Sequence, residues 1–303
     1  MPYHGLNAWM LSLWLGAYDQ GLAYAGLALG TYLTLRVLNF ADLTVDGAFA
    51  LGGGSAALLL SQQVAPPLAL LVAVALGALA GTATGLIHTR LGVNDLFAGI
   101  LTTTGLYSIT LRLMGRSNIP LTDLHLALDQ LPDLGLGSDG RWLLALLLVM
   151  GGLIALLALL LATDLGLALR AIGNNAVMAR SNAISTRRGL TLGIAAGNGL
   201  VALAGALVAM YQGFADVTMG IGSLILGLGA VIVGESVLRP RTVPQALLAV
   251  VLGSVLFRAM IALALQLGME PVDLKLATAL LLLAALGLGR LRIPGVSDPG
   301  GGR

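Results

Sequence analysis

The sequence contains no cysteine, and this absence excludes disulfide bonds, thiolate metal sites and cysteine nucleophiles. The single lysine, Lys275, does not follow a glycine-rich loop, and the chain lacks the G-x-x-x-x-G-K-[ST] motif of nucleotide-binding proteins. The three histidines are far apart and do not have metal-ligand spacing. No serine has the sequence context of a hydrolase nucleophile. We therefore expect a chain that is not an enzyme, with no catalytic residues, no metal site and no cofactor.

Charged side chains are also scarce, at 10% of 303 residues against about 25% in an average soluble domain. Hydrophobic residues reach 57%, the mean hydropathy is +0.94, and residues 47–89 contain no Asp, Glu, Lys or Arg. This composition places the protein in a lipid bilayer. The small positive net charge comes from arginine, and we interpret it as an orientation signal rather than affinity for nucleic acid. Residues 1–15 lack a basic region followed by a cleavage site, so we expect no removed signal peptide.

Charge, proline and glycine divide the chain into apolar segments, which predict a single transmembrane domain over residues 1–303. The fold class expected is an all-α polytopic membrane protein with about nine transmembrane helices, within a range of roughly 8–10. The nine predicted spans are about 18–35, 46–61, 66–87, 96–114, 142–162, 189–211, 221–237, 243–267 and 274–289. The apolar stretch 6–15 either forms a short interfacial helix or merges with the first span.

Glycine is abundant, with 42 residues, and membrane helices tolerate it because small residues let helices approach closely. The series Gly77, Gly81 and Gly85 has the four-residue spacing of such a packing face, as does the pair Gly193 and Gly197. We therefore interpret the glycine-rich pieces within spans as packing surfaces.

The arginines are distributed unevenly along the chain, which predicts an orientation. If the loop at about 163–189 is cytoplasmic, alternation of the spans places further arginines on the same side: Arg36, Arg90, Arg239, Arg241, Arg290 and Arg292. The opposite side receives most of the acidic residues: Asp19, Asp123, Asp129, Asp133, Asp139, Asp216, Glu270 and Asp273. The N-terminus is then outside and the C-terminus inside. The long loop at about 115–141 is acidic and would face an extracytoplasmic partner.

The 163–189 loop is more than a charged interruption between two apolar segments. It carries four arginines, and its apolar residues recur at roughly helical spacing: Leu167, Ile172, Val177, Met178 and Ile184. Gly173 and the pair Asn174 and Asn175 are suited to breaking and capping a short helix. The simpler interpretation is a basic loop that only sets the topology. The alternative is an amphipathic helix that fits a groove on a partner.

A short repeat occurs in the two halves of the chain. Residues 40–44 read FADLT after the first span, and residues 214–218 read FADVT after the sixth. Asp95-Leu96 and Asp273-Leu274 continue this register at nearly the same offset. Five residues can match by chance, but an odd number of spans between the copies would make the halves inverted repeats, as in many transporters.

Polar residues within or beside the spans are candidates for lining a translocation pathway. These candidates are Asn39, Asp42, Asp46, Thr102, Thr103, Thr104, Asn198 and Asp216. The alternative for Asp42 and Asp46 is a solvated interfacial loop, and the threonines can bond to carbonyls of their own helix. Arg258, within the eighth span, either lines the pathway or lies nearer an interface.

Taken together, these residues resemble the permease subunits of bacterial ABC importers, in the branched-chain amino acid and ribose permease superfamily. That family's cytoplasmic loop has a G-x-A-x-R-A start, an Asn-containing turn, M-A, and a terminal I-x-T. The matching positions here are Gly166, Ala168, Arg170, Ala171, Asn174, Asn175, Met178, Ala179, Ile184 and Thr186. Leu38–Ala41 matches the L/I-N-F-A motif, and Asn39–Gly54 is most similar to permeases of tryptophan/tyrosine-type uptake systems. The family's glycine-rich motif near the eighth span is altered here, to Gly234-Glu235-Ser236.

The resemblance implies a type II-like permease fold in the bacterial cytoplasmic (inner) membrane. It implies a second permease subunit, with a homodimer expected, a cytosolic ABC ATPase dimer and an extracytoplasmic solute-binding protein, besides membrane lipid. The loop residues implied to couple to the ATPase are Arg170, Gly173, Asn174, Asn175, Met178, Ala179 and Arg180. The leading hypothesis is uptake of a small polar solute, an amino acid being the first choice. The alternative is a secondary transporter driven by an ion gradient.

Overall fold

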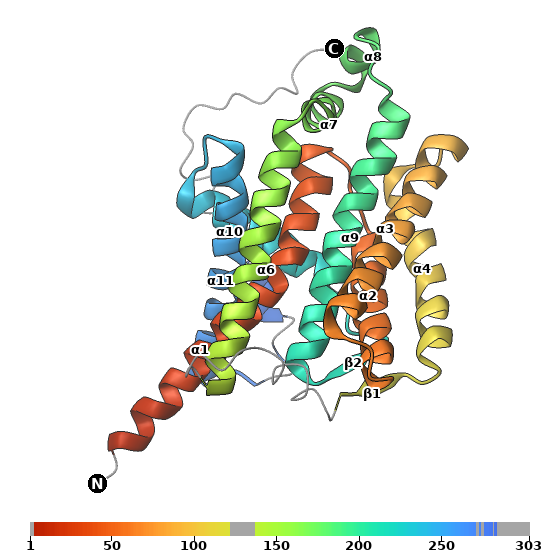
Figure 1. Ribbon diagram of the computed structural model, residues 1–303. Coiled ribbons are helices and arrows are strands. Elements are labelled where there is room, and N and C mark those ends of the chain that lie inside the picture. Colours follow the sequence, from red (N-terminus) through yellow and green to blue (C-terminus); the bar gives the residue numbers. More distant parts are fainter. Residues whose placement is uncertain (1–2, 122–136, 271–272, 274–275, 281, 284–303) are drawn as a thin grey trace.

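The computed structural model describes residues 3–121, 137–270, 273, 276–280 and 282–283 and is a bundle of long helices (Figure 1). The helices in chain order are α1 (Tyr3–Thr31), η1 (Tyr32–Val37), α2 (Thr44–Ser61), α3 (Pro66–Leu91), α4 (Asp95–Met114), α6 (Gly137–Ala162), α7 (Asp164–Asn174), α8 (Ala176–Ser181), α9 (Thr186–Gln212), α10 (Ser223–Leu238) and α11 (Val243–Gln266). η1 is a π-helical continuation of α1. Two short strands, β1 (Asn118–Pro120) and β2 (Phe214–Asp216), lie at the end of the bundle opposite α7 and α8.

The predicted membrane helices are confirmed in part. Within the described residues, six helices are long and apolar enough to cross a membrane: 44–61, 66–91, 95–114, 140–162, 186–212 and 243–266. α10 is apolar but has only 16 residues. The first predicted span lies in α1 and η1, and the stretch 6–15 merges with it because α1 is continuous. Most of the ninth span and of the 115–141 loop lies outside the described residues.

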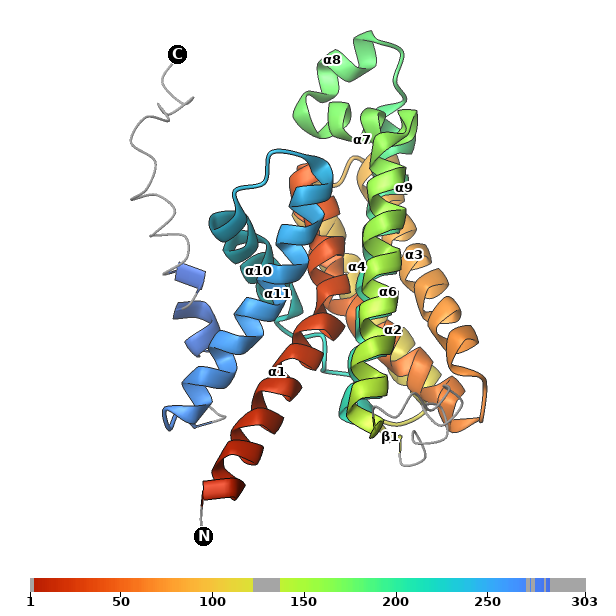
Figure 2. The same cartoon turned by 60° about the vertical axis from the view of Figure 1, so that its left-hand side comes forward.

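α1 and α9 cross at the centre of the bundle and pack against most of the other helices (Figure 2). Glycines allow this close approach: a Cβ at Gly26 would lie 3.2 Å from the carbonyl oxygen of Leu200. The predicted packing face of α3 is confirmed, because a Cβ at Gly81 would lie 2.5 Å from the carbonyl oxygen of Ile194 in α9. Small residues therefore let the helix backbones approach closely at these crossings.

The helices α2 and α10 begin close to each other inside the bundle. The first turn of α2 contains Asp46, whose carboxylate bonds to backbone N–H groups at the start of α10. From there α2 runs toward the two strands, and α10 runs toward η1 at the opposite end. Two N-terminal helix ends thus face each other in the interior, which is the arrangement of interrupted helices in many transporters.

The structure adds a small sheet to the helical fold predicted from sequence. β1 and β2 pair antiparallel, with Ile119 opposite Ala215, and both of these side chains are buried. The pair is extended by a hydrogen bond of 2.7 Å from the N–H of Leu121 to the carbonyl oxygen of Gly213. The sheet joins the chain beyond α4 to the chain beyond α9, so it ties the two halves of the sequence together.

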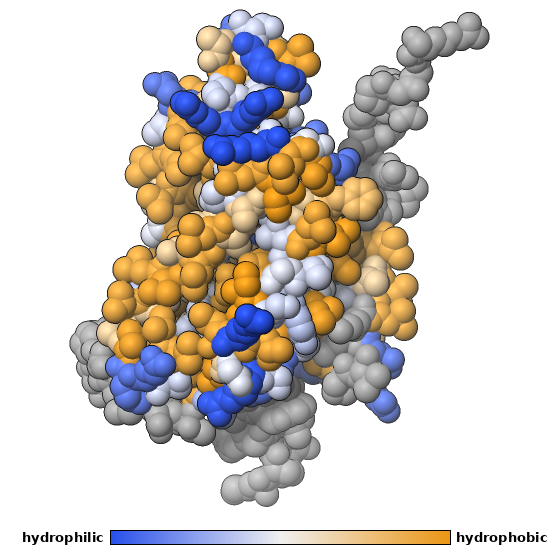
Figure 3. Space-filling model, turned by 90° about the vertical axis from the view of Figure 1, so that its right-hand side faces the viewer, coloured by the Kyte–Doolittle hydropathy of each residue, from blue (hydrophilic) through white to orange (hydrophobic). Residues whose placement is uncertain are grey.

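The surface divides into an apolar band and two more hydrophilic ends (Figure 3). One hydrophilic end is formed by α7, α8 and the adjoining helix ends, where arginines lie at 90, 180, 187 and 188, all exposed. The helix faces between the ends expose large apolar side chains such as Leu71, Leu79 and Leu148. This distribution is that of a multi-pass membrane protein.

Candidate functional site

A chain of buried polar side chains connects α9 with α2, α3 and α4. Asn198 of α9 donates from Nδ2 to Oδ2 of Asp42 at 2.6 Å, and Oδ1 of Asp42 accepts from the N–H of Thr44 at 2.9 Å. The hydroxyl of Thr44 lies 2.7 Å from that of Thr84 in α3, which donates to the hydroxyl of Thr102 in α4 at 2.9 Å. The five side chains thus form one continuous network, which we call the Asp42 network.

The Asp42 network is closed to solvent. Asp42 is 3% exposed and Asn198 and Thr84 are 0% exposed, so the solvated-loop interpretation of Asp42 is wrong. The second hydrogen of Asn198 Nδ2 bonds to the carbonyl oxygen of Ile194, while its Oδ1 has no partner within the described residues. A buried carboxylate held by uncharged donors is costly, and such groups usually hold a fixed geometry or serve transport.

The Asp46 carboxylate caps α10. Its Oδ1 accepts from the Ser223 hydroxyl and the Leu224 N–H, both at 2.9 Å, and its Oδ2 accepts from the Gly222 N–H at 3.1 Å. A carboxylate at a helix N-terminus satisfies orphan donors and complements the helix dipole. Asp46 therefore fixes the junction of α2 and α10.

The remaining pathway candidates lie apart from the Asp42 network. Asn39 is exposed with φ 52°, a left-handed conformation that Asn adopts more readily than most residues. Thr103 bonds to the carbonyl oxygen of Leu43 at 2.7 Å, whereas Thr104 is exposed and bonds only within its own helix. Hydrogen bonds from the hydroxyl and the N–H of Thr218 lower the pKa of Asp216, in β2, despite partial burial.

The two FAD-x-T segments adopt the same local turn. In the first, the N–H of Thr44 bonds to Asp42 Oδ1 at 2.9 Å, and in the second the N–H of Thr218 bonds to Asp216 Oδ1 at 2.7 Å. An aspartate that accepts from the backbone two residues later is an Asx turn, so the shared sequence has a shared structural role.

The loop at 163–189, for which the sequence predicted one short amphipathic helix, folds into two short helices, α7 and α8. Asn174 ends α7, and Asn175 caps α8 by accepting at Oδ1 from the N–H groups of Val177 and Met178, both at 3.0 Å. The apolar residues of α8 project from the protein, with Met178 64% exposed and Val177 68% exposed. Val177 and Met178 thus form an exposed apolar tip on α8.

The buried face of α7 rests on the ends of the membrane helices. Ile172 is buried, and a Cβ at Gly173 would overlap the carbonyl oxygen of Val37 at the end of η1. Arg170 donates from Nη2 to the carbonyl oxygen of Leu161 at 3.2 Å and also anchors α7. Ala179 is buried and Arg180 is exposed on α8.

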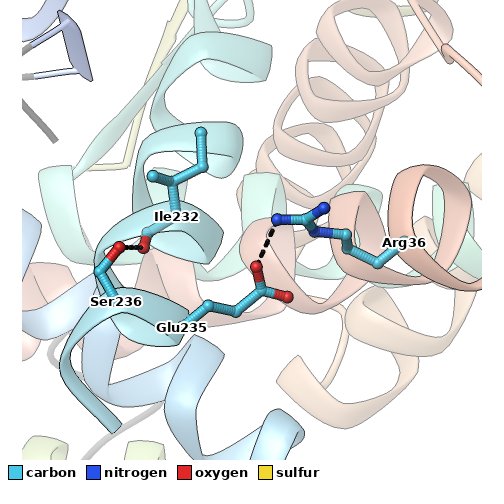
Figure 4. Close-up of polar contacts among 4 residues, drawn as sticks. All are labelled: Arg36, Ile232, Glu235 and Ser236. Carbon is cyan, nitrogen blue, oxygen red and sulfur yellow. Dashed lines mark hydrogen bonds and ion pairs between the residues drawn. The ribbon is translucent and has the colours of Figure 1, made fainter. Parts of the chain in front are cut away.

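η1 is in turn joined to α10 by an ion pair. Arg36 donates from Nη2 to Oε2 of Glu235, and this is the one salt bridge among the residues that the structure describes (Figure 4). Ser236 beside it bonds to the carbonyl oxygen of Ile232 in its own helix. A continuous set of contacts therefore runs from α7 through η1 to α10.

Sequence reasoning identified three members of the Asp42 network, Asp42, Thr102 and Asn198, but missed Thr44 and Thr84. Thr44 is the last residue of the first FAD-x-T segment, and Thr84 follows Gly77 and Gly81 on the packing face of α3. Both residues thus lie in sequence patterns that stand out, but the hydrogen bond between them depends on how α2 packs against α3. No group of three or more His, Asp or Glu side chains suited to a metal occurs within the described residues.

Replacing Asp42 by asparagine is expected to reduce uptake by the intact transport system more than it reduces the amount of the chain in the membrane. The new amide cannot accept from both Asn198 Nδ2 and the Thr44 N–H, and a buried group without a partner costs about 1–3 kcal/mol. Initial uptake rates are compared with membrane levels by immunoblotting. The control is Ser61→Ala, because the exposed hydroxyl of Ser61 bonds only within α2. Equal uptake by the Asp42→Asn variant and the parent chain would contradict a role in transport.

Comparison with known proteins places these features in context. Residues 16–286 match the family described as branched-chain amino acid transport system / permease component. The chain is 38% identical over 279 residues to a tyrosine transport system permease protein of Clostridioides difficile (strain R20291), covering 92% of each chain. It is 31% identical over 280 residues to an uncharacterized protein of Rickettsia prowazekii (strain Madrid E), covering 91% of this chain and 97% of the relative. No solved structure matches the sequence significantly.

Proposed function

Because the chain belongs to the family of permease components of branched-chain amino acid transport systems, we propose that it is the transmembrane permease subunit of an ABC importer. It forms the translocation pathway for a small polar solute, and a separate cytosolic ATPase dimer hydrolyses ATP to drive transport. A second permease subunit, with a homodimer expected, and an extracytoplasmic binding protein complete the importer. The chain itself does not hydrolyse ATP.

The observation that carries this proposal is the α7–α8 unit. It presents an apolar tip, Val177 and Met178, while its other side is packed on η1. A partner that binds the tip can therefore displace membrane helices through rigid contacts. The residues Arg170, Gly173, Asn174, Asn175, Met178, Ala179 and Arg180 are the coupling segment of this proposal. A short helix in a groove is a common recognition mode, and it suits an ATPase surface.

The proposed orientation places α7 and α8 in the cytoplasm, the N-terminus outside and the C-terminus inside. The support is the arginine distribution, because exposed arginines gather at the end of the bundle that carries α7 and α8. The N-terminus lies at the opposite end (Figure 1). The membrane in this proposal is the bacterial cytoplasmic membrane.

An inverted repeat relates the two halves in this proposal. Within the first half α2 packs on α3, and within the second half the equivalent helix α10 packs on α11. Between the halves, α3 packs on α9, and the equivalent helix α11 packs on α1. Phe40 and Phe214 are 174 positions apart, and so are two pairs in direct contact, Gly26 with Leu200 and Asp46 with Gly220. Contact between equivalent positions is expected where the elements of two repeats meet at a two-fold axis.

The solute in this proposal is an amino acid. The support is the relative from Clostridioides difficile, whose name specifies tyrosine transport and which aligns with nearly the whole chain. Within this proposal the pathway candidates are Asn39, Asp42, Asp46, Thr102, Thr103, Thr104, Asn198 and Asp216.

Reconstitution separates this proposal from an ion-gradient-driven transporter. Proteoliposomes are prepared with the full chain alone and with the ATPase and binding protein that co-purify with it from native membranes. We expect uptake of labelled amino acid only with both partners and ATP. Uptake by the chain alone, driven by a proton or sodium gradient, would contradict the proposal.

A further inference from the structure

α11 carries an unusual charge. Arg258 is the only Asp, Glu, Lys or Arg between Arg241 and Glu270, and it lies about two turns before the end of the helix at Gln266. One turn earlier, Ser254 donates its hydroxyl to the carbonyl oxygen of Gly21 at 2.8 Å, so this side of α11 faces α1. The guanidinium is therefore turned toward the bundle and is half-buried there.

No carboxylate forms an ion pair with this guanidinium within the part of the chain that the structure describes. The one salt bridge there is between Arg36 and Glu235, and the contact of Arg258 is with an aromatic ring. Its guanidinium carbon lies 3.8 Å from the ring centroid of Tyr24 in α1. A charged residue at the centre of a membrane helix costs about 2.5–3.5 kcal/mol, and such residues mark pathways for solutes or ions.

The aromatic contact extends to a second ring. Tyr24 stacks on Phe49 of α2, with ring centroids 5.6 Å apart and an interplanar angle of 25°. Phe49 is fully buried and lies three residues beyond Asp46, where α2 and α10 meet. Arg258, Tyr24 and Phe49 thus place a cation and aromatic surface beside the junction of two interrupted helices, the usual position of solute sites in transporters.

The positions equivalent to Tyr24 and Arg258 are closed. The shift of 174 positions that aligns the FAD-x-T segments also aligns Thr84 with Arg258, and Tyr24 with Asn198. Thr84 and Asn198 are fully buried in the Asp42 network and bond within it, whereas Arg258 and Tyr24 are half-buried. Each pair takes one residue from each half: Thr84 and Asn198 are sealed inside the protein, whereas Tyr24 and Arg258 leave a ring and a cation partly accessible.

We infer that Arg258 and Tyr24 form a binding site for the solute during its passage, in which the guanidinium leaves the face of the Tyr24 ring to bind the carboxylate of an aromatic amino acid and the ring of that amino acid takes its place on Tyr24. Arginine suits this task because its planar guanidinium binds carboxylates through two hydrogen bonds and also stacks on aromatic faces. The inference rests on the proposed function and adds the chemical class of the solute.

The absence of cysteine in the chain allows a direct test by single-cysteine labelling. The assembled importer carrying Tyr24→Cys is treated in right-side-out vesicles with an anionic and a cationic methanethiosulfonate reagent. The labelling rate with each reagent is divided by the rate at which the same reagent reacts with a small free thiol in solution. We expect the anionic reagent to be favoured, and R258Q to lower this preference at least about tenfold, which corresponds to 1.4 kcal/mol. R258K should retain most of it. L-Tyrosine should slow labelling, whereas its amide, which lacks the carboxylate, should not.

A matched control is Ser61→Cys, exposed at the end of α2 on the side of the strands, whose labelling should not respond to R258Q. The inference is overturned if the cysteine at position 24 does not react with either reagent, if R258Q leaves the rate ratio unchanged, or if the amide protects as well as tyrosine. ATP-dependent uptake by the parent importer is measured in the same vesicles. Its absence would contradict the proposed function instead, because the labelling ratio does not depend on ATP.

Discussion

Replacing Met178 by glutamate is expected to reduce ATP-dependent uptake at least about thirtyfold, which corresponds to the loss of one interface hot spot of about 2 kcal/mol. Met178 is 64% exposed at the tip of α8, and its N–H, rather than its side chain, takes part in the cap by Asn175. The change therefore leaves α8 intact while placing a charge where an apolar partner surface would bind. Uptake, ATP hydrolysis and retention of the ATPase during purification are measured together.

The matched control for this prediction is Leu91→Glu. Leu91 is the last residue of α3, is 73% exposed, and lies at the same end of the protein outside the α7–α8 unit. The Leu91→Glu variant should take up solute at a rate close to that of the parent chain. If Met178→Glu retains both uptake and the bound ATPase, the apolar tip is not the docking surface, and the basic-loop interpretation of residues 163–189 is favoured.

Replacing Gly205 by valine is expected to prevent stable folding. A Cβ at this position of α9 would overlap the carbonyl oxygen of Phe49 in α2, which is a backbone atom and cannot move aside. Overpacking of a core commonly costs about 1–3 kcal/mol, and a backbone overlap at the centre of the bundle should reach or exceed the upper value. The amount of monodisperse protein is followed by size-exclusion chromatography in detergent after heating.

Gly151→Val provides the control, because no atom lies within 4 Å of a Cβ at Gly151 on α6. It adds the same side chain to a membrane helix without a packing conflict, so its melting temperature should match that of the parent chain. Equal stability of the two variants would contradict the close crossing of α2 and α9.

Local signals in the sequence predicted local structure well. The helix break near Gly173 and the cap by Asn175 depend on a few adjacent residues, and both are present. The apolar segments likewise predicted the long helices, since length and composition determine whether a helix can span a bilayer. The strands β1 and β2 were missed because three residues are too few for a periodic pattern.

Contacts between distant segments could not be predicted in the same way. Asn198 and Asp42 were both singled out as polar residues, but they are 156 positions apart, and their contact depends on the rotation of α9 against α2. For the same reason Arg258 could be assigned either to the interior or to an interface. Periodicity gives the apolar face of one helix, whereas the pairing of faces follows from the packing of the whole bundle.

Two links between the halves of the chain, one at each end of the bundle, differ in strength. At one end, β1 and β2 join the halves by backbone hydrogen bonds around the buried Ile119 and Ala215. At the other end, the half-exposed ion pair of Arg36 and Glu235 contributes only about 0–1 kcal/mol. α7 packs against η1, which carries Arg36, so a load applied to α7 acts beside the weaker of these two links.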